Sequence, residues 1–280
     1  MNTQVLIVGC GDLGTELARR LKQDGLASIG VRRSQAKDAG FPCLQADVTN
    51  PSSLAALQNI NPEFLVYCVA ASAQTDENYR QHYVDGLRYV LEALRGASNL
   101  KHVFFVSSTR VYGQISEALL DEAVPASPSD FGGQRLLEAE ALLANAHQAW
   151  TYTSLRLTGI YGPGRTRMLN LAASTLQWPQ QNSWTNRIHR DDAAAFIQHL
   201  IQMKLRQQPL QDCYVVTDSC PAPQHEVLHW IAKHMGKDVV AQMPPVDGGK
   251  RMSNQRMLAT GFELRYPDYK AGYADLLQSV

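Results

Sequence analysis

The sequence predicts an α/β fold: a doubly wound, parallel β-sheet with helices on both faces and a small C-terminal lobe. The apolar run 5–8 breaks into Gly9-Cys10-Gly11-Asp12-Leu13-Gly14 and then resumes with helical spacing. This strand–turn–helix order is typical of a dinucleotide-binding unit. Strand-like and helix-like segments then alternate without interruption, as they do where each parallel strand is followed by a crossover helix.

Each glycine of the first turn has a physical role in such a unit. Gly9 takes the turn, Gly11 lets a pyrophosphate approach bare backbone, and Gly14 lets the helix pack closely on its strand. The helix begins near Asp12, so the free N–H groups of its first turn, which includes Leu13, point at an anion. We therefore expect a Rossmann dinucleotide site here; a purely structural turn is the alternative.

The following elements are predicted from their apolar patterns. The strand 103–106 is the most continuously apolar and should be buried on both faces. The others are strands at 27–31, 44–48 and 64–71 and helices at 51–57 and 79–94.

Three strand ends supply the remaining cofactor candidates. Arg32 and Arg33 stand where an NAD-selective site usually has an acidic residue, and arginine suits a 2′-phosphate, so NADP is favoured over NAD. Solvated arginines at a strand end would leave NAD possible. Asp47, with Val48 beside it, could lie near the adenine, and the small Ala70 and Ala71 would let the cofactor pass close by.

Composition narrows the class of protein. The 280 residues are 45% hydrophobic and 19% charged with a formal net charge of zero. Nothing indicates a nucleic acid or membrane partner, and the sequence shows neither a leader nor an apolar run of about 18 residues. We therefore expect a cytoplasmic protein. Its five cysteines have no CxxC spacing and are read as reduced, mostly packed thiols.

Four blocks resemble one family, the extended short-chain dehydrogenase/reductases of the NAD(P)-dependent epimerase and dehydratase group, which act mostly on nucleotide sugars. The blocks occur in the family's order over about two thirds of the chain. They are the glycine turn, Ser107-Ser108-Thr109-Arg110-Val111-Tyr112-Gly113, 155–164 (LRLTGIYGPG) and 188–193 (IHRDDA). The resemblance implies a catalytic role for Ser108, as a hydrogen-bond donor to the reacting oxygen, and substrate contact at Ser108 and Thr109.

The family's catalytic Tyr-x-x-x-Lys pair is missing. Phe131 stands at the position of the tyrosine, whose phenolate takes the alcohol proton, and Arg135 stands at that of the lysine. Arg135 could still bind ribose hydroxyls. Tyr83 and Gly159 replace two further family asparagines, so the resemblance is to the atypical branch of the superfamily.

Two functions therefore remain open. One is an NAD(P)-dependent enzyme acting on a nucleotide sugar or related alcohol by hydride transfer, with Tyr112, Tyr161 or His189 as candidate replacement bases. The other is a non-catalytic or redox-sensing NAD(P)-binding protein. The family resemblance also makes a homodimer possible, through the helices that end near 94 and 143.

The C-terminal third offers weaker signals. Arg165, Arg167, Lys250 and Arg251 are candidate substrate-binding residues, although solvated surface positions would use the same residue types. The run 225–229 (HEVLH) matches a zinc-hydrolase pattern, but we expect its two histidines on a solvated helix flank and no metal. We expect one cofactor domain, 1–165 plus about 188–220, and a small lobe, about 166–187 plus 221–280.

Overall fold

A computed structural model describes residues 4–34, 40–114, 116, 118–146, 149–239 and 243–278. The chain forms two compact units, which we describe separately. Unit 1 comprises Met1–Gly113, Ala126–Arg156 and Ala194–Tyr214, and unit 2 comprises Gln114–Pro125, Leu157–Ala193 and Val215–Val280.

Unit 1 is built on a seven-stranded sheet with the order β11-β7-β5-β4-β1-β2-β3. The pairs β1–β2, β1–β4, β2–β3 and β4–β5 are parallel. The chain first winds from β1 toward β3 and then continues from β4 on the other side of β1. Ligands bind at the carboxyl end of the strands at such a reversal. The strands are β1 (Val5–Val8), β2 (Ser28–Arg32), β3 (Cys43–Gln45), β4 (Phe64–Tyr67), β5 (His102–Ser108), β7 (Thr151–Leu157) and β11 (Cys213–Val216).

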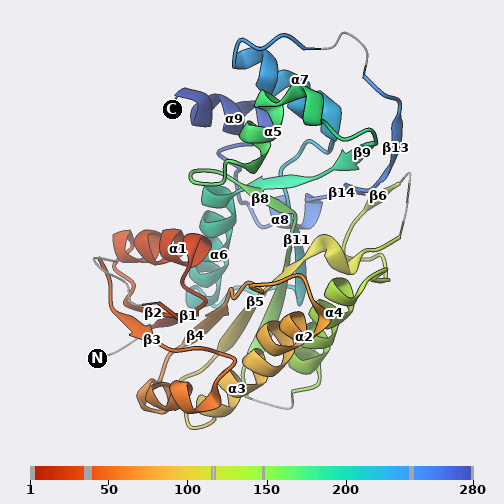
Figure 1. Ribbon diagram of the computed structural model, residues 1–280. Helices are drawn as coiled ribbons and strands as arrows, with labels where there is room; N and C mark the ends of the chain where they lie inside the picture. Colours follow the sequence, from red (N-terminus) through yellow and green to blue (C-terminus); the bar gives the residue numbers. More distant parts are fainter. Residues whose placement is uncertain are drawn as a thin grey trace. The chain divides into compact units, whose positions relative to one another are not determined.

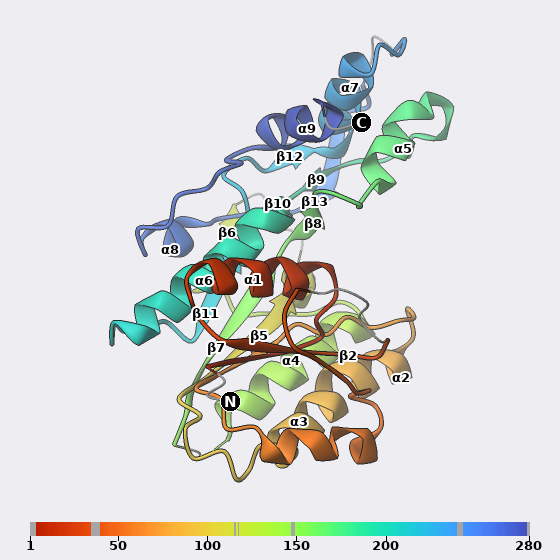
Figure 2. The same ribbon diagram turned by 90° about the vertical axis from the view of Figure 1, so that its left-hand side faces the viewer.

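Helices cover both faces of this sheet (Figures 1 and 2). On one face lie α1 (Asp12–Gln23) and α6 (Arg190–Leu205), joined where the Gln198 amide donates to Asp24. On the other lie the 3-10 helix η1 (Pro51–Asn59), α2 (Asp76–Tyr79), α3 (Gly86–Ala93) and α4 (Phe131–Ala144). The predicted α/β class with a doubly wound parallel sheet is confirmed.

The central strands are buried because helices cover them on both sides. Val103, Phe104 and Phe105 of β5 have no exposed surface, which confirms the prediction for this strand. Several predicted elements differ in detail: the strand expected at 64–71 ends at Tyr67, and the helix expected at 51–57 is the 3-10 helix η1. The strand expected at 44–48 ends at Gln45, and the helix expected at 79–94 begins at Asp76 and contains a π-helical stretch, η2 (Arg80–Asp85).

A buried ion pair connects three elements of unit 1. Arg156 of β7 lies 2.6 Å from Glu140 of α4, and both side chains are about nine-tenths buried. Ser107 Oγ donates to Glu140 at 2.6 Å, and Arg156 donates to the Tyr112 hydroxyl at 2.6 Å. The carboxylate and the guanidinium therefore satisfy each other and fix the end of β5 against α4 and β7.

Unit 2 consists of small sheets and helices. The pair β8 (Gly159–Tyr161) and β10 (Arg187–His189) is parallel, β9 (Asn182–Thr185) lies between β12 (Ala222–Pro223) and β13 (Val246–Gly249), and β6 (Leu119–Leu120) pairs with β14 (Arg251–Met252). Its apolar core includes residues of α5 (Arg167–Ala173), α7 (Gln224–His234) and α9 (Tyr269–Gln278). The short helices η4 (Thr175–Gln177) and α8 (Gln255–Leu258) complete it.

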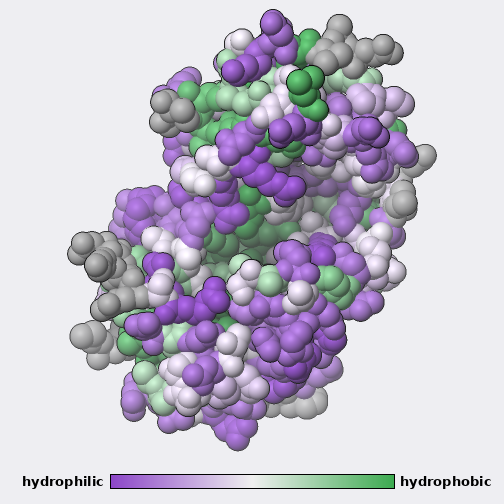
Figure 3. All heavy atoms as spheres, viewed as in Figure 1, coloured by the Kyte–Doolittle hydropathy of each residue, from purple (hydrophilic) through white to green (hydrophobic). Residues whose placement is uncertain are grey.

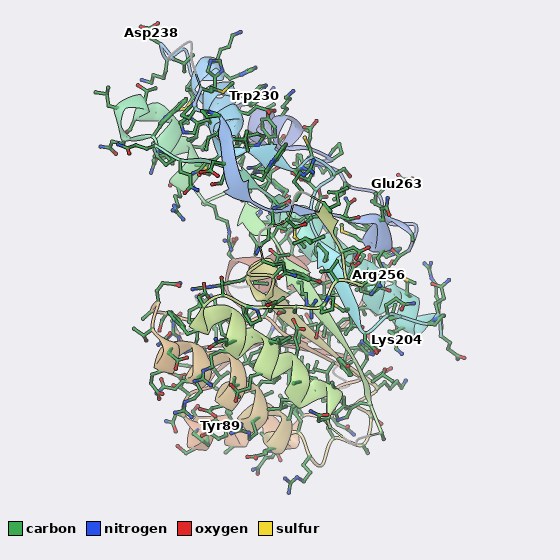
Figure 4. The ribbon with its side chains drawn as sticks, turned by 90° about the vertical axis from the view of Figure 1, so that its right-hand side faces the viewer. Tyr89, Lys204, Trp230, Asp238, Arg256 and Glu263 are labelled. Atoms are coloured by element: carbon green, nitrogen blue, oxygen red, sulfur yellow. The ribbon has the colours of Figure 1, made fainter. Side chains whose placement is uncertain are left out.

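The division between the units differs from the boundaries expected from the sequence. Residues 157–165 and 188–193 belong to unit 2 because β8 and β10 pair with each other. The segment 114–125 joins unit 2 through β6 and through Glu122, whose carboxylate accepts from the Val215 N–H and lies 3.5 Å from Arg256 of α8. Figure 4 labels Arg256. Such pairings between distant segments leave no local signal in the sequence.

The visible surface over α2 and α4 is mostly hydrophilic (Figure 3). Among the helices of the described ranges, none combines the length and apolar character needed to cross a membrane.

The buried ion pair gives a stability prediction. Glu140→Gln removes the carboxylate charge and leaves the Arg156 guanidinium uncompensated, so the free energy of unfolding should fall by about 3–5 kcal/mol. The matched control is Glu63→Gln, which breaks the more exposed pair with Lys101 at 2.7 Å and should cost below about 1 kcal/mol. Urea unfolding of the three proteins measures both changes, and equal losses would contradict the assignment.

Candidate functional site

The glycine turn lies between β1 and α1. Gly9 has φ +92°, and a Cβ there would lie 2.5 Å from the Val69 nitrogen, so only glycine fits. A Cβ on Gly14 would lie 3.1 Å from Ile7 Cγ2, so α1 and β1 are in close contact there. The roles predicted for Gly9 in the turn and Gly14 in helix packing are confirmed.

The start of α1 fits a pyrophosphate group. Gly11 is the N-cap, and within the described ranges no side chain caps this helix end. A Cβ on Gly11 would have only the Gly9 oxygen, at 3.9 Å, as a neighbour. The bare backbone and the first-turn N–H groups of Asp12, Leu13 and Gly14 therefore form the kind of cradle that binds anions.

The ends of β2 and β3 carry the candidate adenosine-side residues. Arg32 donates to Ser34 at 3.1 Å, and Arg33 is exposed. Burial disfavours the charge on Asp47, but two hydrogen bonds from Thr49, at 2.9 and 2.8 Å, outweigh it and lower the pKa of the carboxyl. Asp47 is therefore a carboxylate, and the positive charge of Arg33 also stabilises its ionised form.

Small residues follow β4, as the sequence predicts. Ala70 is exposed, and the Ala71 N–H donates to the Tyr83 hydroxyl at 3.4 Å. Val48 is buried and packs close to Gly86. Val48 is therefore a packing residue against the start of α3, and its side chain does not face solvent.

Ser108 is the last residue of β5. Its Oγ accepts from the Arg110 N–H at 3.2 Å and so caps the 3-10 helix η3 (Thr109–Val111). The Thr109 side chain is buried. Ser108 therefore performs the capping role that a serine after a buried strand can have, while its half-buried hydroxyl keeps a hydrogen to donate.

Arg135 is engaged in ion pairs. Its guanidinium donates twice to Asp76, at 2.7 and 2.9 Å, and once to Glu138 at 2.7 Å. These hydrogen bonds raise the pKa of an already permanent cation. To bind ribose hydroxyls, Arg135 would have to release one of these carboxylates and donate to the hydroxyls instead.

A cluster beside Phe131 was not singled out from the sequence. The Arg110 guanidinium lies 5.3 Å from the Phe131 ring and 2.9 Å from the Asp130 carboxylate, and it donates to the Tyr79 hydroxyl at 2.7 Å. The Tyr79 and Phe131 rings meet edge-on at 5.5 Å. A phenol bound to a fixed cation therefore lies next to the phenylalanine.

The sequence does carry one signal for this cluster, Gly132-Gly133 at the start of α4. A Cβ on Gly132 would lie 2.4 Å from Arg110 Cζ, and one on Gly133 would lie 2.5 Å from the Arg110 carbonyl oxygen. Two glycines inside a helix are unfavourable by themselves. They are explained by the close approach of Arg110.

The three residues considered as replacement bases lie in the interior. Tyr112 is fully buried and accepts from Arg156. Tyr161 stacks on Tyr273 at 4.7 Å, and His189 is fully buried, where burial lowers its pKa to about 4. Packing roles explain all three better than proton transfer does.

The candidate substrate-binding cations belong to unit 2. Arg167 is exposed at the start of α5, and Arg165 is half-buried. The Lys250 carbonyl accepts from the Asn186 side chain at 2.7 Å, and Arg251 lies over the Trp184 ring at 5.1 Å. Arg251 is therefore partly a packing residue.

The zinc-like pattern on α7 is structural. His225 is buried rather than solvated as expected, because its ring bonds the Pro179 carbonyl at 2.7 Å. Glu226 accepts from Tyr269 at 2.8 Å. No cluster of three or more metal-ligating side chains occurs in the described ranges.

Comparisons with known proteins identify the family. The family model "NAD dependent epimerase/dehydratase family" matches residues 5–212. This chain belongs to that family. No curated protein matches it.

Solved structures agree with this family. A Methylobacillus flagellatus protein assigned to the NAD-dependent epimerases/dehydratases is 52% identical, with TM-score 0.91 over 100% of this chain and 99% of that one. Thermus thermophilus UDP-glucose 4-epimerase in complex with NAD shares the fold at 18% identity, with TM-score 0.78 and coverage of 99% and 100%. Helicobacter pylori ADP-L-glycero-D-manno-heptose-6-epimerase does so at 17% identity, with TM-score 0.81 and coverage of 99% and 96%.

Unit 2 also contains a buried acid that the sequence did not reveal. Burial raises the pKa of Asp218 to about 7 despite the charge of Arg187. Its Oδ1 accepts from the Cys220 N–H at 3.1 Å, and its Oδ2 is buried without a hydrogen-bond partner among the described residues. Asp218 therefore favours the protonated form.

This raised pKa predicts a pH-dependent stability. The folded pKa lies above the unfolded value, so the contribution of Asp218 is complete below about pH 4 and is lost as the pH rises through 7. Asp218→Asn mimics the protonated acid. Urea unfolding should give equal stability for variant and wild type near pH 4 and a variant more stable by a few kcal/mol near pH 8. A constant difference across this range would contradict the assignment.

Proposed function

We propose that this protein is an NAD(P)-dependent enzyme that acts on a nucleotide sugar or a related alcohol. The observation that supports this best is that the uncapped start of α1 and the Ser108 hydroxyl lie at the same, carboxyl edge of the parallel sheet. That edge, at the reversal of strand order, is where a dinucleotide and its substrate meet in such folds. The whole-chain similarity to two nucleotide-sugar epimerases is consistent with the substrate class.

A bound nicotinamide dinucleotide would supply hydride acceptance and donation. The first-turn N–H groups of α1 would hold its pyrophosphate, and Ser108 would donate a hydrogen bond to the reacting oxygen. Arg32 and Arg33 would meet a 2′-phosphate, so we propose a preference for NADP over NAD.

The proton acceptor in this proposal is Tyr79. Phe131 has no oxygen, whereas the Tyr79 phenol lies beside it and accepts from Arg110 at 2.7 Å. Arg110 orients the phenol through this hydrogen bond, and the phenol in turn donates to the Gln74 side-chain oxygen at 3.1 Å. Asp130, the N-cap of α4, keeps Arg110 in place through the 2.9 Å bond.

A non-catalytic or redox-sensing NAD(P)-binding protein is the second candidate. Two observations favour it: Phe131 has no titratable group, and Arg135 is paired with Asp76 and Glu138. In this alternative the cluster around Arg110 is a packing feature and no substrate is turned over.

Fluorescence titration with NADPH and NADH, followed by addition of a panel of nucleotide sugars, separates the two functions. Binding with cofactor oxidation or reduction supports the enzyme, and binding without turnover supports the second candidate. If neither dinucleotide binds, both proposals fail.

The same titration tests the cofactor preference. Arg33→Ala removes a charge that NADH does not use, so the Kd for NADPH should rise about tenfold, while the Kd for NADH should stay nearly unchanged. NADH is therefore the internal control. A parallel loss for both dinucleotides would show that Arg33 does not read the 2′-phosphate.

The role of Tyr79 is tested by Tyr79→Phe. Turnover of a nucleotide sugar identified above should fall by about 10²–10⁴-fold, because the ring remains and only the proton acceptor is lost. The Kd for the dinucleotide should not change. Tyr89→Phe on α3 (Figure 4) is the matched control and should retain full activity. Full turnover in Tyr79→Phe would exclude this role.

A further inference from the structure

The thiols of Cys10 and Cys43, both in unit 1, lie next to Gly30 of β2. Cys10 lies inside the glycine turn, and its N–H donates to the Val31 carbonyl at 2.9 Å. Cys43 begins β3 and lies opposite Gly30 in the register of β2 and β3. A Cβ on Gly30 would be 2.8 Å from Cys10 Sγ and 3.0 Å from Cys43 Sγ. Because Gly30 has no side chain, both sulfurs lie against the space that its Cβ would fill.

The surroundings give the two thiols different roles. Cys10 is buried, and burial raises its pKa to about 12. Cys43 is half-buried, and burial raises its pKa against the opposing effects of the Arg32 charge and the Cys10 S–H donor. Cys43 is therefore the thiol that a small oxidant can reach, and Cys10 is its buried neighbour.

We propose that Cys10 and Cys43 form a dithiol oxidation site at which hydrogen peroxide closes a disulfide between the glycine turn and β3. The Cys43 thiolate attacks the peroxide, the O–O bond breaks, and the leaving hydroxide takes a proton to give water, so that Cys43 becomes a sulfenic acid. Cys10 then loses its proton, attacks the Cys43 sulfur and displaces hydroxide, which the same proton converts to water. Two thiols are oxidised and one peroxide is reduced to two waters.

The disulfide changes the shape of the turn. An S–S bond of about 2.05 Å is shorter than any non-bonded contact between two sulfurs, so Cys10 and Cys43 must move toward each other. Gly9 and Gly11 are its chain neighbours, and the first N–H groups of α1 follow directly. Closing the disulfide should therefore weaken dinucleotide binding. This consequence rests on the proposed function, whereas formation of the disulfide does not.

The test is to treat the reduced full-length protein with hydrogen peroxide and map its peptides without reduction. We expect a Cys10–Cys43 linked peptide that dithiothreitol removes. Its rate of formation should rise about tenfold per pH unit between pH 7 and 9, as the thiolate fraction grows. In NADPH titration the oxidised protein should show a Kd raised about tenfold or more, reversed by dithiothreitol.

Two variants act as controls. Cys68→Ala removes the third thiol near the turn, whose Sγ donates to the Gly9 carbonyl at 3.3 Å, and should leave the link intact. Gly30→Ala keeps both cysteines and should prevent the link, because its methyl group would separate the sulfurs. A Cys10–Cys68 link, a Cys43 sulfinic acid without a link, or linkage in Gly30→Ala would each overturn the proposal.

The two proposals fail separately. If the reduced protein does not bind NADPH, the proposed function fails, but the peptide map still decides whether the dithiol forms a disulfide. If the disulfide forms and the Kd for NADPH is unchanged, the effect on dinucleotide binding is refuted.

Discussion

The carboxyl edge of β5 depends on the buried pair of Glu140 and Arg156. Neither charge could remain in the interior alone, because desolvation of an unpaired ion costs several kcal/mol. Each also binds a neutral hydroxyl: Glu140 accepts from Ser107, and Arg156 donates to Tyr112. The network therefore extends from the end of β5 to the residue that follows η3. Ser108, the residue after Ser107, therefore ends a strand that this network holds in place. The pair is less a source of stability than a constraint on geometry, since an apolar replacement would fill the same space without orienting a hydroxyl.

The fold could be predicted from the sequence because its determinants are local. The glycine turn, the apolar strand at 103–106 and the alternation of strands with helices all follow from neighbours in the chain. The unit boundaries could not be predicted, since the segment 114–125 joins unit 2 through β6 and Glu122, whose partners lie far along the chain. Likewise, nothing near His225 in the sequence shows that the Pro179 carbonyl is its partner.

The candidate site was predictable in part for the same reason. Residues fixed by strand ends, such as Gly9 and Ser108, lie where the pattern places them. Tyr79 and Arg110 were missed because their contact forms only where α2 and η3 meet at the start of α4. Phe131 draws attention to one position, whereas its surroundings are set by all the side chains that pack against it. The adjacent glycines Gly132 and Gly133 are the sequence feature that reflects this close packing.

The π-helical stretch at Arg80–Asp85 affects how this chain should be compared with its relatives. A π-helical turn contains one residue more than an α-helical turn of the same span, so it is equivalent to an insertion inside an otherwise regular helix. Residues before it, including Tyr79, are rotated by about 100° relative to the face that an uninterrupted helix would present. An alignment of this segment without a gap therefore matches equivalent residues on only one side of the π-helical stretch. A relative without this turn would carry the equivalent of Tyr79 one position nearer to the equivalent of Gly86.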